Sequence, residues 1–217
     1  MVEKENLKKV IEDLKKAKQR KFSQSYDLIV NLKDIDLKKT ENQIDLFITL
    51  RYSKGKENTV CALIGPESKP EADANCDFVI EEKEFEKYQK DPKATKRLAD
   101  KYDFFIAQAN IMPKIAGAFG KIFGPRKKMP NPKAGCVFPP KAALKPLVAK
   151  LKNMVRVTAK ESGIIQVTAG NEKMADEEVI DNIKTIYEQI IHKLPGEKNN
   201  IRNIYLKLTM AKPIKIM

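Results

Sequence analysis

Tryptophan is absent from this chain, histidine occurs once and cysteine three times in 217 residues. Because His192 stands alone, any catalytic or metal site that needs two histidines is excluded. The cysteines, Cys61, Cys76 and Cys136, are odd in number and include no C-x-x-C pair. This pattern argues against a disulfide scaffold or a zinc module and favours a reducing compartment, in which each cysteine is a small core residue.

Long apolar runs are also lacking. None approaches the roughly 18 residues of a membrane-spanning helix, and the first residues lack the apolar stretch of a secretory signal. We therefore expect a cytoplasmic protein that neither spans a membrane nor is secreted by that route. A hydrophobic content of 42% over 217 residues is enough to bury a core in one or two domains.

Acidic residues are missing from one long segment. Residues 104–160 contain no Asp or Glu but 12 Lys or Arg, and this excess accounts for most of the formal net charge of +13. A solvated protein surface usually mixes charges of both signs, so the segment indicates an anionic partner. Nucleic acid fits better than a membrane surface, which would require a basic amphipathic helix with bulky exposed apolar groups. Residues 4–21 carry the cations, but their apolar stripe is narrow. We expect it to be buried in the protein core, which leaves no apolar surface for a membrane.

The expected elements at the two ends of the chain differ in kind from those in the middle. The spacing of Leu7, Val10, Ile11 and Leu14 predicts a helix. The terminal segments further predict a long helix over 176–194 and strands over 26–32, 44–52, 155–158, 163–168 and 201–210. In the middle, short apolar strands over 59–64, 77–80 and 103–108 alternate with helices, the last of which is expected to begin near Pro139. Such alternation is typical of a parallel sheet between two layers of helices.

The predicted fold class is therefore α+β and α/β in two domains. Residues 1–57 and 157–217 are expected to form one discontinuous α+β sandwich. Residues 58–156 are expected to form an inserted three-layer Rossmann-like α/β domain.

Signatures of catalysis are sparse. The chain contains no G-x-x-x-x-G-K-[ST], G-x-G-x-x-G, G-x-S-x-G or H-E-x-x-H motif. Gly117, Gly120 and Gly124 form a series whose spacing fits neither nucleotide fingerprint, so we expect them to allow close packing of a helix. No cofactor, metal ion or catalytic residue is predicted. An RNA-processing enzyme whose middle domain binds a nucleotide stays open as the alternative.

One segment combines stiffness with positive charge. Residues 124–135, GPRKKMPNPKAG, hold three prolines, two glycines and the four cations Arg126, Lys127, Lys128 and Lys133. Proline restricts the backbone, and a rigid loop loses less conformational entropy on binding than a flexible tail. We therefore predict that this loop, called the basic loop below, is an accessory site for phosphate contacts.

The run around the basic loop, IMPKIAGAFGKIFGPRKKMPNPKAGCV at 111–137, resembles the signature region of the ribosomal protein L-one family. Members of this family are the universal stalk proteins of the large ribosomal subunit. Two shorter matches support the resemblance, Lys21-Phe22 before the first strand and Thr209-Met210 at the end of the last one. The chain departs from the family at Ala211, where a Gly-Pro pair usually begins, and at Lys127-Lys128, where many members have Gly-Leu. With the short N-terminus, these departures resemble an archaeal member.

The resemblance implies a structural, non-enzymatic protein that binds a stem and loop of large-subunit ribosomal RNA. That RNA and protein form the mobile stalk beside the exit site for transfer RNA. The resemblance also implies a translational repressor that binds its own messenger RNA and a monomer outside the ribosome, and it leaves direct contact with exit-site transfer RNA open. It places the RNA surface on the terminal domain, at Lys21, Phe22, Lys160, Gly163, Arg202, Asn203, Lys207, Thr209 and Met210.

Overall fold

The chain divides into two compact units in the computed structural model, which describes residues 4–16, 20–140, 142–160 and 162–216. Unit 1 contains residues 1–57 and 153–217, and unit 2 contains residues 58–152. The insertion therefore ends four residues before the predicted boundary at 156. The reason is that strand β7 (Met154–Ala159) begins at Met154 and pairs along its length with β2 (Ile44–Thr49), which belongs to unit 1.

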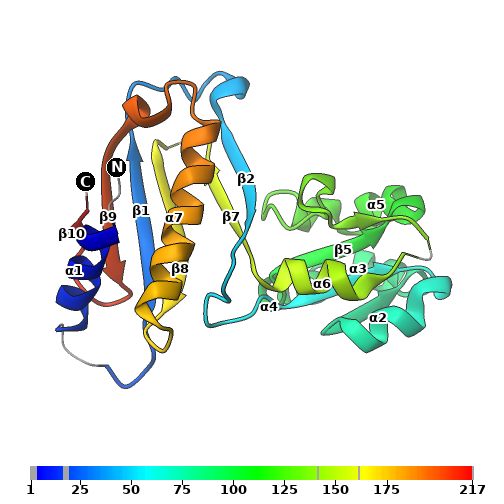
Figure 1. Ribbon diagram of the computed structural model, residues 1–217. Helices are drawn as coiled ribbons and strands as arrows, with labels where there is room; N and C mark the ends of the chain where they lie inside the picture. Colours follow the sequence, from blue (N-terminus) through cyan, green and yellow to red (C-terminus); the bar gives the residue numbers. More distant parts are fainter. Residues whose placement is uncertain (1–3, 17–19, 141, 161, 217) are drawn as a thin grey trace. The chain divides into compact units, whose positions relative to one another are not determined.

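Unit 1 is built on an antiparallel sheet of order β10-β9-β1-β8, beside the separate pair β2-β7. Its strands are β1 (Ser25–Leu32), β8 (Ile164–Asn171), β9 (Ile201–Leu208) and β10 (Ile214–Lys215). Strand β1 lies in the centre, so that Asp27 is paired with Thr168 on one side and with Lys207 on the other. Segments from both ends of the chain thus make one sheet, as the blue, yellow and red strands of Figure 1 show.

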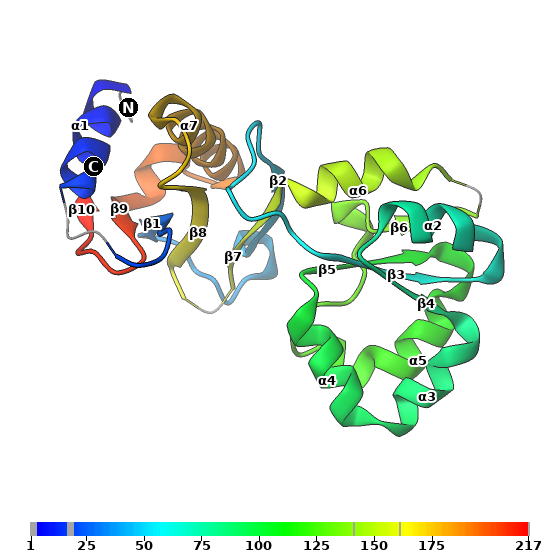
Figure 2. The same cartoon turned by 90° about the horizontal axis from the view of Figure 1, so that it is seen from below.

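Two helices cover one face of this sheet, α1 (Lys4–Lys15) and α7 (Asp176–Lys193) (Figures 1 and 2). All four apolar residues that predicted the first helix are buried. Helix α7 has Asp176, Glu177 and Glu178 in its first turn and Lys193 in its last, an arrangement that complements the helix dipole. The α+β class predicted for the terminal segments is confirmed.

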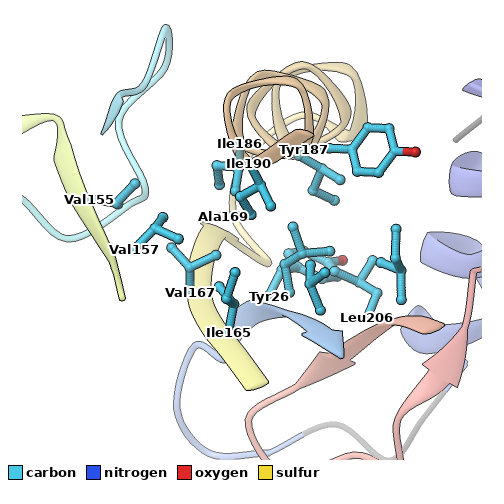
Figure 3. Packing of buried hydrophobic residues seen from close by; sticks show 14 of the residues in the cluster. Tyr26, Val155, Val157, Ile165, Val167, Ala169, Ile186, Tyr187, Ile190 and Leu206 are labelled. Carbon is cyan, nitrogen blue, oxygen red and sulfur yellow. The ribbon is translucent and has the colours of Figure 1, made fainter. Parts of the chain in front are cut away.

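The core of unit 1 lies between α7 and the sheet. Ile186 and Ile190 point from α7 toward Ala169, and Tyr26 and Val167 come from the strands (Figure 3). Burial raises the pKa of Tyr26 to about 12. Because side chains alternate along a strand, burying Tyr26 and Val167 turns Asp27 and Thr168 to the face opposite the helices.

Unit 2 is a three-layer α/β structure with a parallel sheet of order β4-β3-β5-β6. The strands are β3 (Val60–Ile64), β4 (Phe78–Glu81), β5 (Phe104–Gln108) and β6 (Val137–Phe138). Helices α2 (Lys69–Asn75) and α6 (Leu144–Lys152) cover one face, and α3 (Phe85–Lys90), α4 (Pro92–Lys101) and α5 (Met112–Phe123) cover the other (Figure 2). The predicted Rossmann-like class is confirmed.

Several element boundaries differ from the sequence prediction, and the physical reason is clear for α6 and for the last long strand. Helix α6 begins at Leu144 and not near Pro139, because Phe138 pairs with Gln108 and the chain must first leave the sheet edge. The last long strand ends at Leu208, because its partner β1 begins at Ser25. Thr209 and Met210 therefore lie in a turn, closed by a hydrogen bond from the Ala211 N–H to the Leu208 carbonyl.

Candidate nucleic-acid interface

The face of the unit 1 sheet that is turned away from α1 and α7 is polar with apolar patches. We call it the outer sheet face and define it by the outward residues of three strands: Asp27, Ile29 and Asn31 of β1, Ile164, Gln166 and Thr168 of β8, and Asn203, Tyr205 and Lys207 of β9. The strands hold these side chains at fixed positions on a rigid surface.

Two shallow hollows lie on the outer sheet face. One of about 300 Å³ is lined by Asp27, Ile29, Gln166, Val167, Thr168 and Lys207. The other, of about 510 Å³, is lined by Asn31, Leu32, Gly163, Ile164, Arg202, Asn203 and Tyr205. In the first hollow the Thr168 hydroxyl donates to Asp27 Oδ1 at 3.0 Å. Each hollow combines apolar walls with hydrogen-bonding groups, the chemistry that fits a ribose or a base edge.

A hydrogen-bonded turn begins after Leu208, one residue beyond Lys207, which lines the first hollow. Thr209 Oγ1 accepts a hydrogen bond from the Ser25 N–H at 3.1 Å, so the threonine hydroxyl extends the pairing of β9 with β1 beyond the end of the strand. Phe22 and Met210 are 51% and 58% exposed, among the most exposed large apolar side chains that the structure describes. A solvated apolar side chain on such a fixed frame is typical of a contact surface.

Of the predicted site residues, Asn203 and Lys207 lie on the outer sheet face, and most of the others lie next to one of its two ends. Phe22, Lys207, Thr209 and Met210 lie toward the start of β1, and the exposed Lys21 directly precedes Phe22. Gly163, Arg202 and Asn203 lie toward the other end of β1, where the Gly163 carbonyl accepts from the Leu32 N–H at 2.7 Å. At about 3.4 Å per residue, an eight-residue strand separates the two groups by roughly 24 Å.

Lys160 is placed differently from the other predicted residues. Its Nζ lies 2.8 Å from Asp45 Oδ2, over the β2-β7 pair. Arg156 donates to the same carboxylate through Nε and Nη2, both at 3.0 Å, and lies 5.1 Å from the centre of the Phe47 ring. Burial favours the neutral form of Asp45, but the hydrogen bonds and charges of Arg156 and Lys160 outweigh it and lower its pKa. Much of the Lys160 charge is therefore balanced within the protein.

We expect Asp45→Asn to destabilise the protein by about 1 to 3 kcal/mol near pH 7, because it removes an acceptor of charged hydrogen bonds. The folded-state pKa of Asp45 lies below its unfolded value, so its contribution is present above the unfolded pKa and is lost as the pH falls through the folded pKa. In urea denaturation, the stability difference between the parent and this variant should shrink below pH 4. A difference that stays constant from pH 7 to pH 3 would contradict this assignment.

The basic loop of unit 2 is held by its own cations. Lys128 Nζ donates to the carbonyls of Tyr102 and Asp103 at 2.9 and 3.1 Å, and burial lowers its pKa. Arg126 forms an ion pair with Asp100 and donates to the Lys96 carbonyl at 3.2 Å. Lys128 thus fixes the loop to the connection before β5, and Arg126 fixes it to α4. Lys127 and Lys133 are exposed.

Several residues of the outer sheet face were missed by the sequence analysis, among them Asp27, Gln166, Thr168 and Tyr205. The signal that could have found them is the alternation of polar and apolar residues along each strand, with Asp27 between Tyr26 and Leu28. Which of the two faces is covered by helices cannot be read from the alternation of one strand. For this reason only the family resemblance could place the RNA surface.

A buried amide lies near the place where a Rossmann-like domain would hold a nucleotide. In this strand order, ligands bind at the carboxyl ends of β3 and β5. The connections that leave these two neighbouring strands run to opposite sides of the sheet. Gln108, which is 1% exposed, ends β5 there. Its Oε1 accepts from the Gly65 N–H at 2.8 Å, and its Nε2 donates to Ser68 Oγ at 3.1 Å. The amide thus occupies the place where the backbone would approach a phosphate.

Within the described ranges, no helix is long and apolar enough to cross a membrane, and His, Cys, Asp and Glu form no group of three that could hold a metal ion. Residues 14–212 match the Ribosomal protein L1p/L10e family. The relatives with similar sequences are named large ribosomal subunit protein uL1. That of Pyrococcus abyssi is 41% identical over 214 residues, which cover 96% of this chain and 95% of the relative. That of Nanoarchaeum equitans is 38% identical over 214 residues, with 95% and 99% covered.

The matching protein of Methanothermococcus thermolithotrophicus is 36% identical over 216 residues, which cover 99% of both chains. These matches define the chain as a structural ribosomal protein and not an enzyme, which removes the alternative of an RNA-processing enzyme. The chain belongs to the Ribosomal protein L1p/L10e family. The resemblance stated from the sequence, including its archaeal character, is confirmed.

Proposed function

We propose that this chain binds a stem and loop of large-subunit ribosomal RNA through the outer sheet face and the adjoining residues Phe22, Thr209 and Met210, and so forms the stalk beside the exit site for transfer RNA. The observation that carries the proposal is the exposure of Phe22 and Met210, which flank in sequence the hydrogen-bonded pair Ser25 and Thr209 at the end of the outer sheet face. The family and the names of the uL1 relatives support it.

The chemistry of the outer sheet face suits RNA of the A form. Such RNA hides its base edges in a deep groove and presents 2′-hydroxyls and phosphates in a shallow one, so that proteins recognise its shape. Short polar groups such as Asn203 and Gln166 can donate to and accept from hydroxyls. The side chains of Phe22 and Met210 can lie flat on a ribose or an unstacked base. Lys21, Arg202 and Lys207 supply cations for phosphates, which position the protein without reading the sequence.

The basic loop has a supporting role in this proposal. Lys127 and Lys133 contact phosphates outside the stem and loop, while Lys128 and Arg126 hold the loop in shape. Contacts of this kind add affinity that depends on salt and little on sequence. They therefore strengthen binding to any RNA.

Affinity for a fragment of the stalk RNA is expected to exceed affinity for a random duplex and to fall steeply with salt. Lys127→Ala should weaken binding to both RNAs alike and reduce the slope of log affinity against log salt by about 1, the change expected for one phosphate contact. Lys87→Ala removes the same charge from the exposed face of α3 and serves as the control. Binding measured at several salt concentrations tests this. Equal affinity of the parent for both RNAs would refute the proposed function.

The proposal includes a second target, the messenger RNA of the protein itself, whose translation the bound protein would repress. Recognition by shape does not distinguish the source of an RNA, so a messenger that folds into a similar stem and loop would occupy the same face. The test is competition: such a messenger fragment should displace the stalk RNA completely. Simultaneous binding of both RNAs to one protein would contradict a shared site.

A further inference from the structure

One buried polar side chain joins three segments of unit 1 beside the outer sheet face. Gln24 is 2% exposed, and its Nε2 donates to Glu172 Oε1 at 3.0 Å. Its Oε1 accepts from the Met210 N–H at 3.0 Å. The backbone N–H of Gln24 donates to Glu172 Oε2 at 2.9 Å, and its carbonyl accepts from the Glu172 N–H at 3.0 Å. The Glu172 carboxylate accepts from the Gln24 NH2 group, and this orients the amide so that its oxygen faces the Met210 N–H.

The bonds connect parts of the chain that are far apart in sequence. Gln24 lies directly before β1, Glu172 directly after β8 and Met210 in the turn after β9, at sequence separations of 148 and 186 residues from Gln24. Phe22 precedes Gln24 by two residues. The Gln24 amide thus bonds directly to the Met210 backbone and lies two residues along the chain from Phe22, the other strongly exposed apolar residue of the proposed RNA surface.

We propose that Glu172 and Gln24 are positioning residues of the RNA surface. The Glu172 carboxylate fixes the orientation of the Gln24 amide, and the amide fixes the Met210 turn against the approach of Phe22. Neither residue needs to touch the RNA, because side chains that make contacts keep their geometry only when a second layer of hydrogen bonds holds them. The inference rests on the proposed function, since it assigns these residues to that surface.

The charge of Glu172 separates positioning from simple electrostatics. A carboxylate beside an RNA site repels phosphate, so on charge alone its removal should strengthen binding to every RNA. In Glu172→Gln the new amide can accept from the Gln24 N–H, but its NH2 group then faces the NH2 group of Gln24. Rotating the Gln24 amide relieves that conflict only by turning its NH2 group toward the Met210 N–H. Positioning therefore predicts weaker binding to the stalk RNA alone.

We expect Glu172→Gln to bind the stalk RNA about tenfold more weakly, the effect of leaving one buried hydrogen bond unmade, and a random duplex as well as the parent or slightly better. The Met210 amide should exchange its hydrogen faster in the free variant. Glu188→Gln removes the same charge from an exposed site on α7 and is the control, with no loss expected on either RNA.

The decisive measurement is the exchange of the two side chains. In the double variant Gln24→Glu with Glu172→Gln, the new amide at position 172 donates to the new carboxylate at position 24, whose other oxygen accepts from the Met210 N–H. All four bonds and the net charge are kept, so the preference for the stalk RNA and the Met210 exchange rate should return to within about twofold of the parent. This rescue also separates positioning from general loss of stability, which thermal unfolding of each variant reports.

Two results would overturn the inference while the parent still prefers the stalk RNA: Glu172→Gln that binds it as tightly as the parent, or a double variant as weak as the single one. A parent without any preference would instead overturn the proposed function, and the inference with it.

Discussion

Replacing Thr209 by valine is expected to reduce affinity for the stalk RNA about five- to 150-fold while affinity for a random duplex stays unchanged. Valine keeps the shape of threonine but leaves the Ser25 N–H without the acceptor that Thr209 Oγ1 provides at 3.1 Å. The turn that this bond fixes, which carries Met210, is then displaced from its position against the RNA. A hydrogen bond to the RNA left unmade in the buried interface costs about 1 to 3 kcal/mol, where each 1.4 kcal/mol corresponds to a factor of ten.

Thr158→Val is the matched control for Thr209→Val. Thr158 lies on β7 opposite Asp45, away from the Met210 turn, and the substitution removes the same hydroxyl. Both variants should be measured on both RNAs at one salt concentration. If Thr209→Val weakens binding to the two RNAs equally, the specific surface lies elsewhere on the molecule.

Phe119→Ala is expected to destabilise unit 2 by about 3 to 5 kcal/mol, the usual cost of deleting a buried phenyl ring. Phe119 is fully buried and meets Phe85 edge-on, with ring centres 5.4 Å apart, and Phe123 at 5.1 Å. Preference for the stalk RNA should survive, because every residue of the outer sheet face belongs to unit 1. Hydrogen exchange followed segment by segment would show faster exchange in residues 58–152 alone.

The reciprocal variant is Ile186→Ala in the core of unit 1, which should cost about 2 to 5 kcal/mol and reduce the preference for the stalk RNA. If Phe119→Ala also abolished that preference, the two units would not be independent in binding. If it accelerated exchange in both units equally, they would not be independent in folding.

Apolar periodicity was sufficient to predict the fold class because burial follows local spacing. Leu7, Val10, Ile11 and Leu14 form one stripe in the sequence and one buried face in the structure. The strands that were predicted differ from the structure only at their ends, as at Leu208, where the length of the partner decides where pairing stops. The two-residue strands β6 and β10 were not predicted, because such short segments carry no alternation. Element boundaries of this kind depend on residues that are distant in the chain, which no local pattern contains.

The partners of charged side chains could not be predicted for the same reason. Lys160 looks like a phosphate ligand in the sequence, but Asp45, more than a hundred residues earlier, balances much of its charge. Lys128 looks the same, but two carbonyls near the start of β5 accept from it. A count of cations therefore overestimates how many of them face an anionic partner. The proposed RNA contacts at Phe22 and Met210 could be predicted only from the family resemblance.

The central place of β1 in the unit 1 sheet has a consequence for the order in which the protein forms during synthesis. Both neighbours of β1 are made late, since β8 begins at Ile164 and β9 ends at Leu208 (Figure 1). Every strand of unit 2 lies within residues 58–152. Unit 2 can therefore complete its sheet before the strands that pair with β1 have been synthesised. Pairing over such separations is slow because the loop must close before any contact forms. The outer sheet face is therefore the last surface to appear, and an unfinished chain does not present it.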